Sequence, residues 1–150
     1  MRRFTFYKGK SLALSALLTE PEHSLIHQSF EAREREEPLN GDGFGVAWYS
    51  PGHDEPALFR SATPAWSNQN LRELARVSES PCVLAHVRAA TEGLQVGERR
   101  SMPTASTPTA AAVMVSSEPL SGDSGWETVP VNHFARIEPN LGMAIEPIAS

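Results

Sequence analysis

Residues 97–112 read GERRSMPTASTPTAAA and separate the chain into two parts of different texture. The run is small, polar and proline-bearing, and it has no apolar periodicity that would predict a helix or a strand. Such a composition is typical of a linker or a disordered segment, because it offers little apolar surface to bury. Since 150 residues fit one domain, we expect 1–150 to form a single domain with a low-complexity junction at 97–112.

Short apolar or alternating segments on both sides of this junction predict a mixture of strands and helices. Strands are expected at 3–7, 43–50, 56–61, 82–89, 112–120, 127–139 and 141–148. A helix is expected at 11–18, after a first strand that ends at Gly9. A second helix is expected at 68–80, with Asn68 as a candidate N-cap and Pro81 as its stop. Its apolar face would consist of Leu71, Leu74, Ala75 and Val77. The charged segment 23–37 is expected to be a solvated helix or loop. This order indicates an α+β fold.

Charge and composition exclude several functions. The net charge of −5 argues against nucleic-acid binding, which needs a basic face. No apolar run approaches the roughly 20 residues of a membrane span, and no apolar segment follows the N-terminal arginines as a signal peptide would require. A single cysteine, Cys82, excludes an internal disulfide and fits a reducing compartment, so a cytoplasmic protein is expected.

The segment NGDGFGVAWY, residues 40–49, places three glycines directly before an apolar strand. It is not a dinucleotide fingerprint, because the glycine spacing is wrong and no βαβ unit surrounds it. Asn40-Gly41 and Asp42-Gly43 are strong turn pairs. Two interpretations follow: a structural turn, or a loop at Gly41, Asp42 and Gly43 that lets a ligand approach the backbone.

The segment AHVRAATEG, residues 85–93, contains a candidate carboxylate site. In a strand, His86 and Arg88 share one face and Ala85 and Val87 the other. A guanidinium at the strand end can hold a carboxylate through two hydrogen bonds, and the Thr91 hydroxyl can add a third. The alternative is a structural salt bridge for Arg88 and a turn hydroxyl for Thr91.

Other polar residues carry weaker signals. His23 and His27 have the spacing of zinc ligands on a helix, but no third ligand is suggested nearby, so no metal or other cofactor is expected. Cys82 begins an apolar strand after Pro81, which predicts a buried, inert thiol rather than a nucleophile.

Taken together and in order, these motifs resemble the class II glutamine amidotransferases of the small stand-alone type. The matching stretches are RFTFYKG (3–9), EPEHSLIHQS (20–29), NGDGFGVAWY (40–49), AHVRAATEG (85–93), SEPL (117–120) and WETVP (126–130). The resemblance implies an N-terminal-nucleophile hydrolase with a four-layer αββα sandwich. It also implies that Arg88 and Thr91 hold the α-carboxylate of glutamine or a γ-glutamyl compound, beside the loop at Gly41, Asp42 and Gly43.

The sequence departs from this family pattern in two places. The family has a nucleophilic cysteine after the initiator methionine, whereas this chain has Arg2, which carries no nucleophilic atom. The family's Asn-Gly oxyanion turn also has no counterpart, and the run 97–112 stands in its place. We therefore expect an incomplete sandwich and a chain that does not hydrolyse the γ-amide. The alternatives are a non-catalytic subunit that binds a ligand or a protein partner, and a truncated gene product without stable function.

Overall fold

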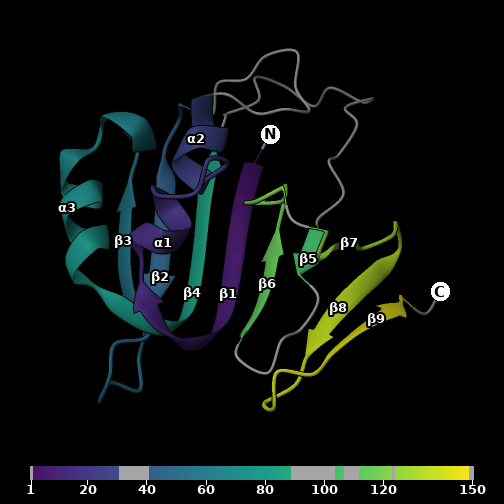
Figure 1. Ribbon diagram of the computed structural model, residues 1–150. Coiled ribbons are helices and arrows are strands. Elements are labelled where there is room, and N and C mark those ends of the chain that lie inside the picture. The colour runs from purple at the N-terminus through teal and green to yellow at the C-terminus, as the bar shows by residue number, and fades with distance from the viewer. Residues whose placement is uncertain (1, 31–40, 89–103, 107–111, 123, 149–150) are drawn as a thin grey trace.

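The computed structural model describes residues 2–30, 41–88, 104–106, 112–122 and 124–148. The elements, shown in Figure 1, are β1 (Arg2–Ala13), α1 (Ser15–Leu18), α2 (Leu25–Phe30), β2 (Phe44–Trp48), β3 (Ala57–Ser61), a 3-10 turn η1 (Ala65–Ser67), α3 (Gln69–Val77), β4 (Glu79–Arg88), β5 (Thr104–Ser106), β6 (Ala112–Ser116), β7 (Trp126–Thr128), β8 (His133–Ile137) and β9 (Met143–Pro147).

Seven strands form one antiparallel sheet in the order β3-β2-β4-β1-β6-β5-β7, and β8 and β9 form a separate hairpin. β1 and β4 lie at the centre and pair along most of their length. The α+β prediction is confirmed. The strand expected at 112–120 is present as β6 at Ala112–Ser116, and it pairs directly with β1.

The helices pack on one face of the sheet, as the alternation of buried residues shows (Figure 1). Along β4, Val83, Ala85 and Val87 are buried, whereas Leu84 and His86 are exposed. The buried set of strand and helix residues that forms the core is Tyr7, Leu14, Leu17, Leu18, Leu25, Ile26, Phe44, Val46, Trp48, Ala65, Leu71, Ala75, Val83, Ala85, Val87 and Leu120. Every second residue of the central strands therefore faces away from the helices.

Residues of the hairpin β8–β9 and of that second face line a common cavity. A cavity of about 400 Å³ separates Phe4 and Phe6 of β1 from Phe134 and Ile137 of β8. Within the described residues, the αββα pattern is thus represented by one helical layer, a large sheet and a two-stranded piece of a second sheet.

The amphipathic helix predicted at 68–80 is confirmed as α3. The side chain of Asn68 accepts a hydrogen bond from the backbone N–H of Leu71 at 2.9 Å, which caps the first turn. Leu71 and Ala75 are buried, but Val77 is 80% exposed, so its assignment to the apolar face was wrong. Helix α3 ends at Val77, before Pro81, and the proline lies inside β4.

The first strand is longer than predicted, and the helix after it is shorter, because β1 pairs with β4 around Pro81. β1 runs through Gly9 to Ala13, and only the last turn of the segment 11–18 is helical. Lys8 pairs with Cys82 and Leu12 with Ser80, so β1 bulges where it faces Pro81. A proline cannot donate to the sheet, and a bulge in the partner strand removes the need for that hydrogen bond.

Two predictions concern segments that are described only in part. Thr104–Ser106 forms β5 inside the sheet, so the prediction of a linker at these three residues was wrong. The remainder of the run, at 97–103 and 107–111, lies outside the described residues. In the segment 23–37, α2 covers 25–30 and buries Leu25 and Ile26, which corrects the expectation of a solvated element there.

Candidate active site

The ends of four strands meet at one corner of the sheet. Arg2 at the start of β1 pairs with Arg88 at the end of β4. Phe44 at the start of β2 pairs with Val87 on one side and with Ser61 on the other. The glycine-rich loop, Arg88 and the backbone of position 2 are therefore neighbours, although 86 positions separate Arg2 from Arg88 in the sequence.

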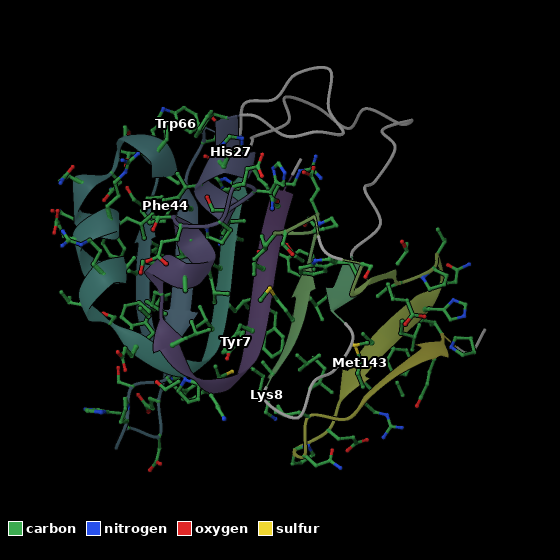
Figure 2. The ribbon with its side chains drawn as sticks, in the orientation of Figure 1. Tyr7, Lys8, His27, Phe44, Trp66 and Met143 are labelled. Atoms are coloured by element: carbon green, nitrogen blue, oxygen red, sulfur yellow. The ribbon has the colours of Figure 1, made fainter. Side chains whose placement is uncertain are left out.

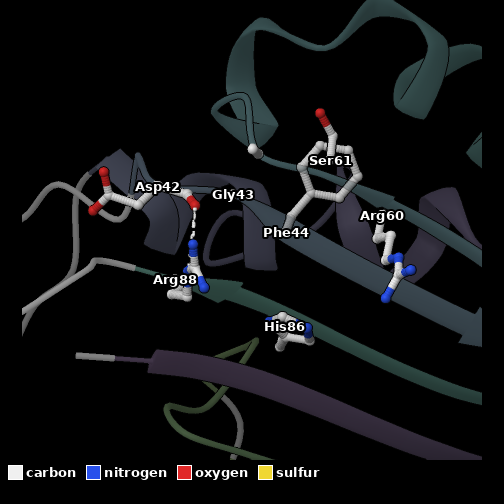
Figure 3. A pocket seen from close by; sticks show the side chains of 8 residues that line it. Asp42, Gly43, Phe44, Arg60, Ser61, His86 and Arg88 are labelled. Atoms are coloured by element: carbon white, nitrogen blue, oxygen red, sulfur yellow. Dashed lines mark hydrogen bonds between the residues drawn. The ribbon is translucent and has the colours of Figure 1, made fainter.

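Arg88 is held by the backbone of the loop (Figure 3). Its Nε and Nη2 donate to the Asp42 carbonyl oxygen at 3.3 and 3.1 Å. The Asp42 N–H donates to the Arg88 carbonyl, and the Arg88 N–H donates to the Gly43 carbonyl, both at 2.9 Å. Arg88 forms no ion pair with any described residue. Its remaining N–H groups are left to donate to a ligand.

Two glycines of the loop and strand are required by close neighbours. Gly43 has φ +125°, and a Cβ there would lie 2.6 Å from the Ser61 carbonyl oxygen. At Gly45 a Cβ would lie 2.7 Å from His86 Nε2. Gly41 instead packs against the ring of Trp66, outside the cavity described next. The loop composition therefore follows from close packing against β3 and β4 as well as from turn geometry.

These residues surround an open cavity of about 420 Å³ (Figure 3). Its lining consists of Asp42, Gly43, Phe44, Arg60, Ser61, Ala62, His86 and Arg88. Two guanidinium groups and one imidazole contribute to the wall, against one carboxylate. A cavity with this excess of cationic and hydrogen-bond-donating groups is suited to an anionic ligand.

Sequence reasoning found Asp42, Gly43 and Arg88 but missed Arg60 and Ser61. Arg60 follows the inward-facing Phe59 in β3, so its position on the outer face was available from the alternation in PALFRS. The alternation could not predict that β3, β2 and β4 lie side by side in this order. Thr91 and the side chain of Arg2 lie outside the described residues, and their predicted roles stay predictions.

Cys82 lies far from this corner. It pairs with Lys8, six residues along β4 from Arg88, which corresponds to about 20 Å of strand. The residue is half-buried, not fully buried as predicted. Burial raises the pKa of the Cys82 thiol, and the nearby Lys8 ammonium lowers it to a smaller extent. A neutral thiol at this distance is a poor nucleophile for a ligand at Arg88.

His23 and His27 lie near α2 and join an aromatic cluster. Their rings are 6.0 Å apart, His27 contacts Phe30, and Phe30 contacts Trp66 edge-on. Figure 2 labels His27 and Trp66 of this cluster. In the described part of the chain, no group of three or more metal-ligating side chains includes them. None of the helices in the described residues is long and apolar enough to cross a membrane.

The sequence of this chain also matches the model of a known protein family. Residues 12–103 match the model of the family described as glutamine amidotransferases class-II, and the chain belongs to that family. The resemblance drawn from the motifs is thereby confirmed.

Curated relatives are also similar to part of this chain. The probable glutamine amidotransferase DUG3 of Saccharomyces cerevisiae is 52% identical over 102 residues, which cover 63% of this chain and 29% of that protein. A gamma-glutamyl-hercynylcysteine sulfoxide hydrolase of Mycobacterium tuberculosis is 34% identical over 97 residues, which cover 64% of this chain and 41% of that protein. The chain thus spans less than half the length of these relatives.

A solved structure was also matched. It is a glutamine aminotransferase class-II domain protein from Silicibacter pomeroyi, 29% identical, covering 55% of this chain and 27% of that one, with a TM-score of 0.37.

Proposed function

We propose that this chain binds glutamine or a γ-glutamyl compound through its α-carboxylate at Arg88, and that it does not hydrolyse the γ-amide. The observation that carries the proposal is the position of Arg88. Its guanidinium is oriented by the Asp42 carbonyl at the mouth of a cavity, beside the backbone of position 2. In the family pattern, that position carries the nucleophile.

The chemistry of the cavity supports carboxylate binding. Arg88 already spends Nε and one Nη2 hydrogen on Asp42, so its outer edge is presented to the cavity in a fixed orientation. A preorganised guanidinium loses less side-chain entropy when it accepts a carboxylate. The Thr91 hydroxyl, three residues further along, is proposed to add a hydrogen bond to the same carboxylate. Since Arg88 is exposed, the net contribution is modest and binding in about the millimolar range follows.

No thiol lines the described part of this cavity to attack the amide carbon. Covalent hydrolysis by this family needs a thiol at the second position, and the residue there is Arg2. Cys82, the one cysteine in the sequence, lies at the far end of β4 with a raised pKa. The proposed role is therefore ligand binding without turnover.

This proposal predicts no glutamine-dependent ammonia release from the purified chain. The Arg2→Cys variant is also expected to be inactive, because the sequence has no second Asn-Gly turn to stabilise the oxyanion, and losing such a donor typically costs about 10²–10³ in rate. A coupled ammonia assay with glutamine and with a γ-glutamyl amide measures both proteins. Release by the parent chain, or release gained in Arg2→Cys, would show that a working catalytic site exists and would contradict the proposal.

A further inference from the structure

A second cavity lies on the side of the sheet that the helices cover (Figure 1). Its volume is about 540 Å³, which is within the range of small-ligand sites. Helix α2 contributes Ile26, His27 and Phe30 to its wall, and α3 contributes Arg72 and Arg76. The cavity shares no lining residue with the candidate active site, so the two can bind different ligands.

Two guanidinium groups form one side of this second cavity. Arg72 and Arg76 are four residues apart on α3, so their Cβ atoms lie about 5–6 Å apart on the same side of the helix. Arg72 Nη2 donates to the Trp66 carbonyl oxygen at 2.9 Å, which orients that group. Arg76 Nη1 lies 3.3 Å from Glu73 Oε2, but these side chains are 71% and 57% exposed, so the ion pair is weak. Both guanidinium groups can therefore donate to one bound anion.

An aromatic ring forms another side of the cavity. Phe30 is 39% exposed, although it is a large apolar side chain. Its ring centroid lies 5.0 Å from that of His27 and 6.3 Å from that of Trp66, and these contacts hold the ring in place. An exposed ring held in this way can stack against a flat ring of a ligand.

The polar residues of the loop before α2 complete the wall. Glu22 carries the one carboxylate among the described residues that line this cavity, and Thr19 adds a hydroxyl. An ionised carboxylate accepts hydrogen bonds and donates none, so it favours a ligand with O–H or N–H groups. The cavity therefore suits a ligand that combines an anion, a flat ring and hydrogen-bond donors.

We propose that this cavity binds a mononucleotide, with its phosphate at Arg72 and Arg76, its base against Phe30, and a hydroxyl or amino group toward Glu22. A phosphate monoester carries nearly two negative charges and three acceptor oxygens, enough for two guanidinium groups, whereas a carboxylate has two oxygens. A mononucleotide needs no extended basic face, so the net charge of −5 does not oppose its binding.

The test compares AMP with its two halves, adenosine and ribose 5-phosphate. Each is titrated into the ¹⁵N-labelled 150-residue chain and followed by backbone amide shifts. We expect saturable shifts at the amides of α2 and α3, and none at Gly43 beside the candidate active site. AMP should bind about tenfold more tightly than either half, because only AMP reaches both the guanidinium groups and the aromatic ring.

Two variants separate the two contacts. Arg76→Gln should weaken AMP and ribose 5-phosphate about three- to fivefold and leave adenosine unchanged. Phe30→Leu should weaken AMP and adenosine about fivefold and leave ribose 5-phosphate unchanged. Arg88→Gln and Leu58→Ala are the matched controls, because they remove an exposed guanidinium and an exposed apolar side chain from the other face of the sheet. Neither control should change AMP binding.

The remaining outcomes would overturn the inference. If AMP and ribose 5-phosphate bound equally, the cavity would not recognise the base. If AMP shifted Gly43 instead of α2 and α3, or if Arg88→Gln weakened it, the nucleotide would occupy the candidate active site. Absence of AMP binding, or AMP binding that neither Arg76→Gln nor Phe30→Leu weakens, would show that these residues form no nucleotide site.

Discussion

Replacing Glu118 by alanine is expected to lower the free energy of unfolding by up to about 3–5 kcal/mol, which is the usual cost of removing one member of a buried ion pair. Arg3 is fully buried, Glu118 is 4% exposed, and Arg3 Nη2 lies 2.8 Å from Glu118 Oε1. The pair joins β1 to the segment after β6, where Ser117 also exchanges two hydrogen bonds with Phe4, each of 3.0 Å. Urea denaturation followed by circular dichroism measures the loss.

Two further variants test whether a loss of stability in Glu118→Ala comes from the unbalanced buried charge. Glu127→Ala removes an exposed carboxylate from β7 and should change stability by no more than about 0.5 kcal/mol. The double variant Arg3→Met/Glu118→Leu removes both charges and should be more stable than Glu118→Ala, because neither charge of the pair then stays buried. A Glu118→Ala protein as stable as the parent would mean that the pair does not hold β1 to this segment.

Replacing Gly43 by alanine is expected to destabilise the fold by about 1–3 kcal/mol, the cost of a side chain in a strained backbone region. The added Cβ would lie 2.6 Å from the Ser61 carbonyl oxygen, and the backbone cannot yield there because Gly43 also accepts the 2.9 Å hydrogen bond from Arg88. We expect the loop to shift and the Arg88 guanidinium to lose its Asp42 contact.

Gly52→Ala is the matched control for this variant. Gly52 also has a positive φ of 79°, but a Cβ there would meet nothing within 4 Å. Its substitution should therefore show the backbone strain alone, and Gly43→Ala should be the more destabilised of the two in the same urea experiment. Equal losses would mean that the contact with Ser61 is not what requires glycine at position 43.

The parts of the fold that the sequence predicted are those with local signals. Alternation in AHVRA placed Ala85 and Val87 on one face and His86 and Arg88 on the other, as β4 has them, because the side-chain period of a strand is fixed by its geometry. The Asn68 cap was equally visible, since its hydrogen bond reaches only to Leu71. These features depend on neighbours a few residues away.

The parts that were missed depend on distant partners. Whether β1 continues past Gly9 is decided by its pairing with β4 across the bulge at Pro81, not by the local composition. Thr104–Ser106 is a strand because β6 and β7 flank it, although its residues read as a linker. Arg60 became a site residue only once β3, β2 and β4 were known to be adjacent. A strand partner supplied from far away in the chain overrides weak local preference.

The most direct test of the central claim, that Arg88 holds the carboxylate of an amino-acid ligand, is a titration of glutamine into the ¹⁵N-labelled chain. We predict saturable shifts at the amides of Asp42, Gly43 and Arg88 with a dissociation constant in about the millimolar range, lost in Arg88→Gln and unchanged in Arg76→Gln, whose arginine lies exposed on α3. Glutamine binding of equal strength in Arg88→Gln, or saturation without shifts at these three amides, would contradict it.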